Sequence, residues 1–281
     1  MKPALRSLNT LDDCRAVVDL QIAVWGHDME TVPAGLLVVS AKRGGILIWA
    51  EDENRLVGFV WSMPGLRASL HTQWSHMLAV LPEYRGRGLG EALKLEQRTR
   101  ALAQGIDLIE WTFDPLQAAN AHLNFVILGT TSTEYLVDVY GPLTGPLHRG
   151  TPTDRLIAEW WIRRPRVESR LASRARVARA PGGADAPRAI ATTQVGDWMQ
   201  AGAVDDGLTT PQVRIPVPAR FGDMQQQATD IALAWRLASR AAFQTYFARG
   251  YRAVDFLLDR GTGAGDYLLE LPTRSRPRAS A

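Results

Sequence analysis

The residues that most directly suggest chemistry are three glycines at alternate positions, Gly86, Gly88 and Gly90. The apolar stretch before them predicts a strand, and the residues after Gly90 predict a helix that begins at once. Glycine lets successive backbone N–H groups face one point without a Cβ in the way, and the positive end of a helix adds its dipole. Such a loop holds a diphosphate through main-chain donors, and Arg85 and Arg87 can add positive charge.

The spacing excludes two common kinds of phosphate loop. A dinucleotide-binding G-x-G-x-x-G fails because the third glycine falls at position 90 and position 91 is Glu. A nucleoside triphosphate loop needs Gly-Lys-Ser/Thr after its last glycine, and that sequence does not follow here. The stretch fits the pattern R-x-x-G-x-G, written here as Arg85-Gly-Arg-Gly88-Leu-Gly90.

With Leu78-Ala-Val80 and Pro82 before this loop and a helix after it, the segment resembles the hallmark of the GNAT superfamily of acyl-CoA-dependent N-acyltransferases. The resemblance covers about residues 3–163. It implies that acetyl-CoA or another acyl-CoA is the co-substrate. The diphosphate of coenzyme A would then lie on the loop residues Arg85, Gly86, Arg87, Gly88, Leu89 and Gly90. The backbone of Leu78, Ala79 and Val80 would pair with the pantetheine arm and place an N–H near the thioester oxygen.

A closer resemblance is to a bacterial subgroup described as predicted acetyltransferases. This resemblance rests on three short sequence segments, Trp111-Thr-Phe-Asp-Pro-Leu116, Asn120-Ala-His-Leu-Asn124 and Pro152-Thr-Asp-Arg-Leu156. Some relatives transfer succinyl groups to amino acids, so that acetyl and succinyl both stay open as the acyl group. Asn120 and Asn124 could hydrogen-bond the pantetheine amides, or could simply form a helix start and one polar face.

Acyl transfer to an amine needs a base that deprotonates the ammonium group. Some members of the superfamily have a histidine two residues before the Leu-x-Val pair, which here is His76. Its strand parity matches that of Leu78 and Val80, and a usual pKa of about 6.5 suits a base at neutral pH. A histidine that only hydrogen-bonds within the sheet is the alternative. Glu110 and Asp114, on one face of the next predicted strand, are alternative bases or structural residues.

The acid of the superfamily is commonly a tyrosine in the pattern A-x-x-x-Y-x-x-x-G-F. Ala121 and Gly129 match that pattern, but the tyrosine position is Phe125, which has no proton to give. Water, Tyr135 or Tyr140 is left to supply the proton.

Two residues are candidates for binding the acceptor, Arg155 and Tyr140. Arg155 could hold a carboxylate through two parallel hydrogen bonds, as an amino-acid acceptor would need. A plain surface arginine is the alternative.

The chain of 281 residues is long enough for two domains. The element order predicts an α/β (α+β) fold, a mixed sheet flanked by helices, over residues 1–165. Residues 166–190, rich in Arg, Pro and Gly, read as a linker, and residues 191–281 as a smaller C-terminal β-α-β-β domain. That domain contains one long predicted helix, 222–248, and Ala242, Tyr246 and Gly250 satisfy the A-x-x-x-Y-x-x-x-G pattern. It thus resembles part of a second GNAT-like unit, without a coenzyme loop of its own. The glycines of 261–266 lie between two predicted strands and predict a hairpin turn.

The charge and the remaining composition bear on partners. Eight arginines against two acidic residues give residues 163–188 a net charge of +6, so that the rest of the chain, at an overall +3, sums to −3. This distribution favours a solvated segment, with contact to nucleic acid as the less favoured reading. A single cysteine, Cys14, rules out an internal disulfide, and no His/Asp/Glu group has the spacing of a metal site. No apolar run approaches the ~20 residues of a membrane span. We therefore expect a cytoplasmic protein without a metal, and a homo-oligomer is left open.

Together these patterns predict an N-acyltransferase that moves an acetyl or other short acyl group, succinyl included, from acyl-CoA to the amine of a small molecule or amino acid. The reaction would be direct attack in a ternary complex. The alternative is a non-catalytic acyl-CoA-binding sensor, which kept the loop and lost turnover.

Overall fold

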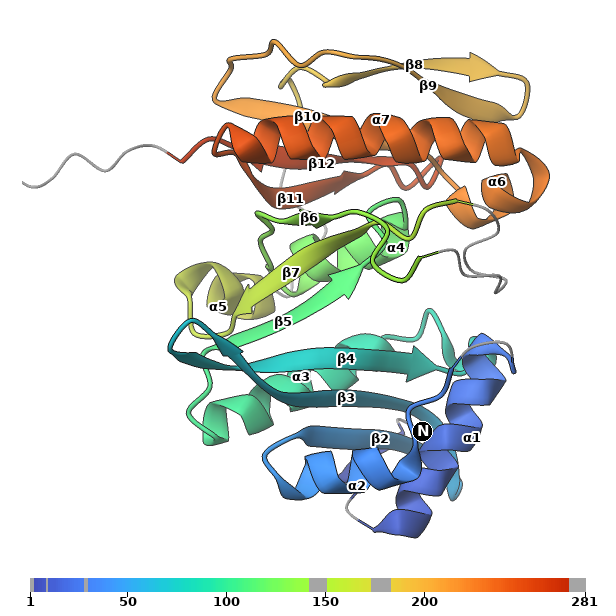
Figure 1. Ribbon diagram of the computed structural model, residues 1–281, viewed down its shortest axis with the longest axis vertical. Helices are drawn as coiled ribbons and strands as arrows, with labels where there is room; N and C mark the ends of the chain where they lie inside the picture. The colour runs from blue at the N-terminus through green and yellow to red at the C-terminus, as the bar shows by residue number, and fades with distance from the viewer. Residues whose placement is uncertain (1–2, 9, 28–29, 142–150, 173–182, 273–281) are drawn as a thin grey trace, which may run out of the picture. The chain divides into compact units, whose positions relative to one another are not determined.

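The computed structural model describes residues 3–8, 10–27, 30–141, 151–172 and 183–272. The chain forms two compact units (Figure 1). The first contains residues 1–112, 144–147 and 158–174, and the second contains residues 113–143, 148–157 and 175–281. The predicted domains are continuous segments that end at residue 165 and begin again after residue 190. The compact units are discontinuous, and the second one combines residues 113–143 with the C-terminal part of the chain.

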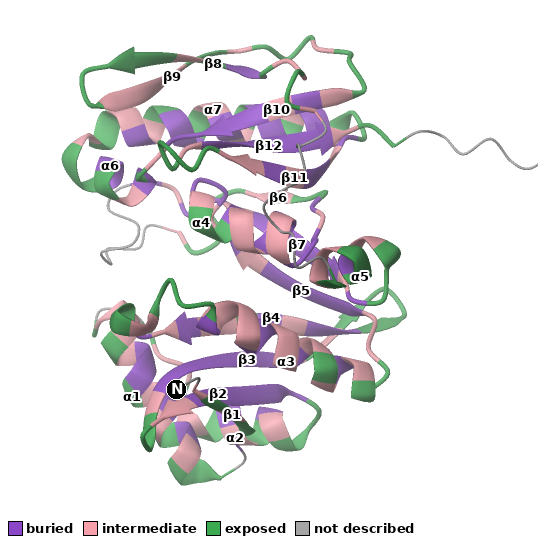
Figure 2. Cartoon of the chain, turned by 180° about the vertical axis from the view of Figure 1, so that it is seen from behind, coloured by how far each residue is buried: buried purple, intermediate pink, exposed green. Residues whose placement is uncertain are grey.

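The fold contains a mixed sheet with helices on its faces, as predicted for the α/β (α+β) fold. Its strand order is β1-β2-β3-β4-β5-β7-β6. The strands are β1 (Ala4–Ser7), β2 (Ile46–Asp52), β3 (Arg55–Arg67), β4 (Leu70–Val80), β5 (Leu108–Phe113), β6 (Tyr135–Leu136) and β7 (Arg155–Trp161). The first four pair antiparallel in sequence order, and β5 then lies parallel to β4. The buried residues of the first unit concentrate in β2, β3 and β5 (Figure 2).

Three helices of the first unit cover the two faces of this sheet. Helices α1 (Leu11–Trp25) and α2 (Ala34–Lys42) lie on one face, where the Trp61 indole of β3 donates a hydrogen bond to Ser40 of α2 at 3.0 Å. Helix α3 (Leu89–Ala103) lies on the other face, where Lys94 reaches Ser75 of β4 at 3.1 Å. A capping box between Thr10 and Asp13 fixes the start of α1.

The second unit has an antiparallel sheet of its own, with strand order β10-β12-β11. These strands are β10 (Gln212–Val217), β11 (Arg252–Leu258) and β12 (Gly265–Glu270). The unit also holds the hairpin of β8 (Ile190–Val195) and β9 (Trp198–Val204), and the helices α6 (Phe221–Gln227) and α7 (Thr229–Ala248). The glycines of 261–266 connect β11 to β12, which confirms the predicted hairpin.

Several elements differ from their predicted form. The long helix expected over 222–248 is divided into α6 and α7, because Ala228 leaves helical geometry with φ −148° and ψ 59°. The helix start suggested at Asn120 is one α-helical turn, α4 (Ala118–Ala121), followed by a π-helix, η2 (His122–Ile127). Strand β6 consists of only Tyr135 and Leu136. The β8–β9 hairpin was not predicted, since its partly exposed strands lack a clear apolar alternation.

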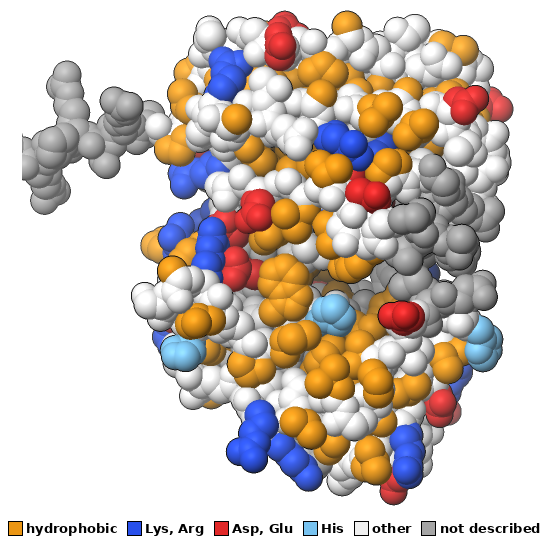
Figure 3. Space-filling model, in the orientation of Figure 1, with side chains coloured by type: hydrophobic (Ala, Val, Ile, Leu, Met, Phe, Trp, Pro, Cys, Tyr) orange, Lys and Arg blue, Asp and Glu red, His pale blue; other side chains and the backbone are white. Residues whose placement is uncertain are grey.

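The arginine-rich segment is only partly described. Helix α5 (Pro165–Ala172) begins within it, and Arg174, Arg176 and Arg179 lie outside the described residues. Arg163 forms an ion pair with Asp107, and Arg188 pairs with Asp266 at 2.8 Å. Basic and acidic side chains are scattered in small groups on the face shown in Figure 3. Among the described residues, no helix is long and apolar enough to cross a membrane.

Candidate active site

The glycine loop connects β4 to α3 through a short 3-10 turn, η1 (Pro82–Tyr84). Gly86 and Gly88 have φ angles of 73° and 78°, in the left-handed region that other residues avoid, and Gly88 caps the N-terminus of α3. A Cβ at either position would meet no atom within 4 Å, so these glycines serve the backbone path rather than local packing. Gly90 already lies in the helix, and a Cβ there would come 3.8 Å from Leu78.

The backbone amides of this loop are open. The first N–H groups of a helix have no acceptor inside the helix. No acceptor among the described residues pairs with the amides of 86–90. Arg85 donates from Nε to the Val80 carbonyl at 3.1 Å, which ties the loop to the end of β4, and the guanidinium of Arg87 lies over the Tyr84 ring. The arrangement is a row of open amide donors at the positive end of a helix, which suits an anion such as a diphosphate.

The strand that leads into the loop has an unpaired edge. Parallel pairing between β4 and β5 is limited to Gln73 with Ile109 and Trp74 with Glu110. Beyond Trp74 the two strands separate, so the Ser75–Val80 stretch of β4 keeps β3 as its only paired neighbour in the described sheet. The predicted backbone contacts at Leu78, Ala79 and Val80 therefore fall on a strand edge that can accept an extended ligand.

His76 lies at an irregularity in β4. Met77 pairs with Trp61 and Ser75 with Ser62, so that the register skips His76, as in a β-bulge. The predicted shared parity with Leu78 and Val80 is therefore wrong. The His76 ring contacts Trp61, with centroids 5.3 Å apart, on the face of α2. Leu78 instead approaches Gly90 of α3 on the opposite face.

The surroundings of the imidazole are those of an available base. The ring of His76 is solvent-accessible and makes no hydrogen bond to any described residue. Partial burial of the ring lowers the pKa of His76 below its usual 6.5, because desolvation disfavours the imidazolium. A neutral imidazole at physiological pH can accept a proton.

The two alternative bases are placed differently. Glu110 on β5 is buried and paired with Arg67 at 3.0 Å, and Arg67 also binds Glu159 at 3.2 Å. Asp114 lies after β5, in the second unit, and receives both Nη atoms of Arg236 at 2.7 and 2.9 Å. Burial alone would raise the pKa of Asp114, but Arg236 and the Leu116 amide hold it below its usual value. A paired, strongly acidic carboxylate suits an ion pair better than general-base work.

The second unit brings the two predicted acceptor residues together. The guanidinium of Arg155 lies 5.2 Å from the centroid of the exposed Tyr140 ring.

Of the two asparagines proposed for the pantetheine arm, Asn120 is exposed whereas Asn124 is buried in the π-helix, so they do not form one polar face.

The tyrosine position of the pattern is a core position. Phe125 is fully buried and packs against Phe113 and Tyr267, with ring centroids 6.1 and 5.4 Å apart. Of the substitutes, Tyr135 donates its hydroxyl to Asp154 at 2.7 Å, and burial with the nearby carboxylate raises the pKa of Tyr135 well above its usual value. The hydroxyl of Tyr246, in the C-terminal copy of the pattern, donates to the Asp205 carbonyl at 2.6 Å.

Sequence reasoning missed Lys94, a buried amine on α3. Its Nζ is 3.6 Å from the centroid of Trp111 and donates to Gln97 at 2.7 Å and to Ser75. Burial lowers the pKa of Lys94 well below its usual value. The signal was available: Lys94 and Gln97 fall between Leu93 and Ala101 on the buried stripe of the helix.

No group of three His, Cys, Asp or Glu side chains in the described part of the chain comes together as a metal site would.

A comparison with known protein families finds one model that is similar to part of this chain. Residues 43–125 match the family model described as an acetyltransferase (GNAT) domain. No curated protein matches the chain in sequence. The family match includes β3, β4, the glycine loop and α3.

Similar solved structures are N-acetyltransferases of low sequence identity. The ribosomal-protein-S18-alanine N-acetyltransferase from Escherichia coli is 17% identical, with a TM-score of 0.43 over 56% of this chain and 91% of that one. The ribosomal-protein-alanine N-acetyltransferase from Brucella melitensis is 19% identical, with a TM-score of 0.44 over 56% and 98%. The PaiA N-acetyltransferase from Thermoplasma acidophilum, solved with coenzyme A, is 15% identical, with a TM-score of 0.39 over 57% and 98%. The match of residues 43–125 shows that this segment of the chain is similar to a GNAT acetyltransferase domain.

Proposed function

We propose that this protein is an acyl-CoA-dependent N-acyltransferase, which transfers an acetyl or other short acyl group to the amine of a small molecule or amino acid. The observation that carries the proposal is the row of open amides at 86–90, within the segment that matches the acetyltransferase domain. Their geometry fits a diphosphate, as coenzyme A would supply. The acyl-CoA would bring an activated acyl thioester to the site.

In the proposed reaction each part of the first unit has a distinct role. Arg85 through Gly90 bind the diphosphate, and the open edge of β4 at 78–80 orients the extended arm with N–H donors directed to the thioester oxygen. His76 removes the proton that an ammonium acceptor must lose before its nitrogen can attack. Its lowered pKa and its lack of a hydrogen-bond partner among the described residues support this role.

The acid step has no dedicated side chain in this proposal. Phe125 cannot donate a proton, and Tyr135 is held by Asp154. A coenzyme thiol has a pKa near that of free cysteine, about 8.5, so a thiolate can leave and take its proton from water. Arg155 and Tyr140 of the second unit are the proposed acceptor-binding residues.

The experiment is release of free coenzyme A thiol from acetyl-CoA and from succinyl-CoA over a panel of small amines and amino acids. We expect amine-dependent thiol release and a product of matching mass. Tight binding of coenzyme A without release under any condition would refute the enzyme and support the alternative, a sensor. The buried Phe125 favours that alternative over a fully equipped catalyst. Failure to bind coenzyme A would refute both.

A further inference from the structure

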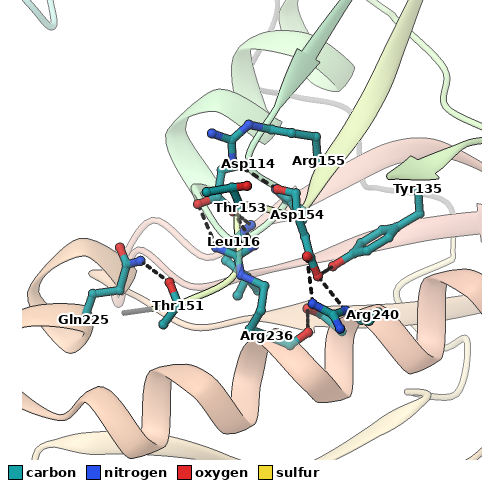
Figure 4. A network of polar contacts seen from close by, with 12 residues as sticks. Asp114, Leu116, Tyr135, Thr151, Thr153, Asp154, Arg155, Gln225, Arg236 and Arg240 are labelled. Atoms are coloured by element: carbon teal, nitrogen blue, oxygen red, sulfur yellow. Dashed lines mark hydrogen bonds and ion pairs between the residues drawn. The ribbon is translucent and has the colours of Figure 1, made fainter. Parts of the chain in front are cut away.

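Five charged side chains of the second unit gather around the start of β7 and the helix α7. They form an arginine–aspartate cluster of Asp114, Asp154, Arg155, Arg236 and Arg240, drawn in Figure 4. Three cations face two anions, so the cluster carries an excess of one positive charge. The pairing of the two aspartates with the three arginines decides which arginine carries the excess positive charge.

The first aspartate, Asp114, forms an ion pair with an arginine of helix α7. Arg236 is 1% exposed and binds both carboxylate oxygens of Asp114, while the Leu116 amide donates to Asp114 at 2.9 Å. This geometry is the strong two-point form of an arginine–carboxylate pair. Asp114 therefore has little accepting capacity left.

The second aspartate, Asp154, also forms an ion pair with an arginine of helix α7. Arg240 binds both oxygens of Asp154 at 2.8 and 2.9 Å. The Tyr135 hydroxyl and the Asp138 amide donate to the same carboxylate at 2.7 and 3.0 Å. Asp154 is fully buried and receives four hydrogen bonds, so it too is saturated.

Arg155 is the cation that remains. Its guanidinium donates to the backbone carbonyl of Asp154 at 3.0 Å, and it forms no ion pair with any described carboxylate. Arg155 is partly buried, and this desolvation lowers the pKa of its guanidinium. The residue still reaches solvent, beside the exposed ring of Tyr140.

The cluster also has an excess of donors. The Nε of Arg236 is buried and has no acceptor in the described structure. A partly desolvated cation without a paired anion is costly, and an anionic ligand would relieve that cost. The planar fork of a guanidinium matches the two oxygens of a carboxylate.

We propose that Arg155 binds the carboxylate of a small ligand, and that Arg236 keeps it available by holding Asp114. Without Arg236, Asp114 would be free to turn to Arg155, since the two already interact electrostatically. Arg236 is thus a positioning residue. That the bound carboxylate belongs to the amine acceptor rests on the proposed function; the carboxylate site itself does not.

The test is a titration of the ¹⁵N-labelled full chain with sodium acetate, with sodium chloride at equal ionic strength as the reference. The arginine Nε–H signal of Arg155, assigned by its loss in Arg155→Lys, should shift saturably with acetate and not with chloride. Sodium phosphate forms a third arm, and a stronger response to phosphate than to acetate would overturn the carboxylate assignment. An acetate response no larger than that to chloride would overturn the site.

Two variants separate positioning from plain stability. Arg236→Gln should weaken acetate binding about tenfold, the loss expected for a charge-assisted hydrogen-bond pair. Asp114→Asn should strengthen it, because the competing charge is gone while a hydrogen bond to Arg236 can persist. A merely structural role would weaken binding in both variants, so equal losses would refute the positioning role. Arg188→Lys, a change at the separate ion pair with Asp266 in the same unit, is the matched control and should leave acetate binding unchanged.

The link to catalysis has its own readout. The comparison uses any amino acid found to be an acceptor and the same amino acid with its carboxylate converted to an amide. In the wild-type protein the KM of the amide should be about tenfold higher than that of the amino acid. In Arg155→Lys the two KM values should be equal. Equal KM values in the wild type would refute the acceptor assignment while leaving the acetate site intact. If no amine is acylated, the acetate titration still tests the site.

Discussion

Arg236 of α7 and Asp114 after β5 form a two-point ion pair across 122 residues of sequence. Both belong to the second compact unit, and the arginine is almost completely buried. Removing one partner of such a pair leaves an uncompensated buried charge, whereas replacing both is far less costly.

Arg236→Met should therefore lower the free energy of unfolding by about 3–5 kcal/mol. The double variant Arg236→Met with Asp114→Leu should recover much of that loss. Urea unfolding followed by tryptophan fluorescence measures both. Asp223→Asn removes an exposed pair with Arg220 at 4.0 Å and serves as the control, with little expected change. A double variant as unstable as the single one would contradict the explanation.

Residues 1–165 alone should not fold cooperatively, although they contain the whole segment predicted as the catalytic domain. The C-terminal part supplies Arg236 to Asp114, and it supplies Tyr267 to Phe125 and to the Pro115 carbonyl at 2.8 Å. Without them, residues 113–141 expose a core face. Thermal melting by circular dichroism and hydrogen exchange of 118–127 should show a broad transition and unprotected amides. Protected amides there would support the division at residue 165 instead.

Gly88→Val should abolish or greatly weaken coenzyme A binding, because Gly88 has φ 78° and its neighbours must direct their amides at one point. Gly105, at the other end of α3, has φ 74° and likewise an open Cβ position. Gly105→Val therefore carries a similar backbone strain away from the loop and is the matched control. Calorimetric titration should show binding lost in the first variant and retained in the second. Equal affinities would refute the diphosphate site.

His76 should give the rate a dependence on pH below neutrality. Since its pKa lies below 6.5, kcat/KM should rise with pH through that lowered pKa and level off above about 6.5. His76→Gln should remove this limb and lower the rate about 10²-fold or more. His71, an exposed residue at the start of the same strand, provides the control variant His71→Gln. An unchanged pH profile in His76→Gln would exclude it as the base.

The same imidazole also links stability to pH. Between the lowered pKa and 6.5 the unfolded chain binds more protons at this site than the folded chain, so stability should fall as the pH drops through that window. Comparison of the unfolding free energy of the wild type and His76→Gln at pH 5 and 7 tests the sign.

Lys94 should make the protein more stable as the pH rises toward 10.5. Its pKa is lowered by burial, so the unfolded chain holds a proton on this amine over a range in which the folded chain has lost it. Lys94→Met keeps a similar volume and should flatten this rise, whereas Lys42→Met at the end of α2 should not. Urea unfolding between pH 7 and 10 gives the comparison. Parallel pH curves for wild type and Lys94→Met would mean that the buried amine stays protonated.

The sequence alone determined the strand–loop–helix with its glycines, the order of the elements in the first unit and the hairpin between β11 and β12. These features depend on periodicity and on backbone angles that only glycine adopts readily, and both are local properties. The same local logic located Arg155 and Tyr140 without showing that they touch.

Tertiary structure decided the rest. The bulge that turns His76 away from Leu78 depends on pairing with β3, and the π-helix at His122–Ile127 is built around side chains buried by β11 and β12. Which arginine receives which aspartate depends on α7, more than 80 residues further along the chain. Strand pairing and burial act between residues far apart in sequence, so no local pattern encodes which arginine pairs with which carboxylate.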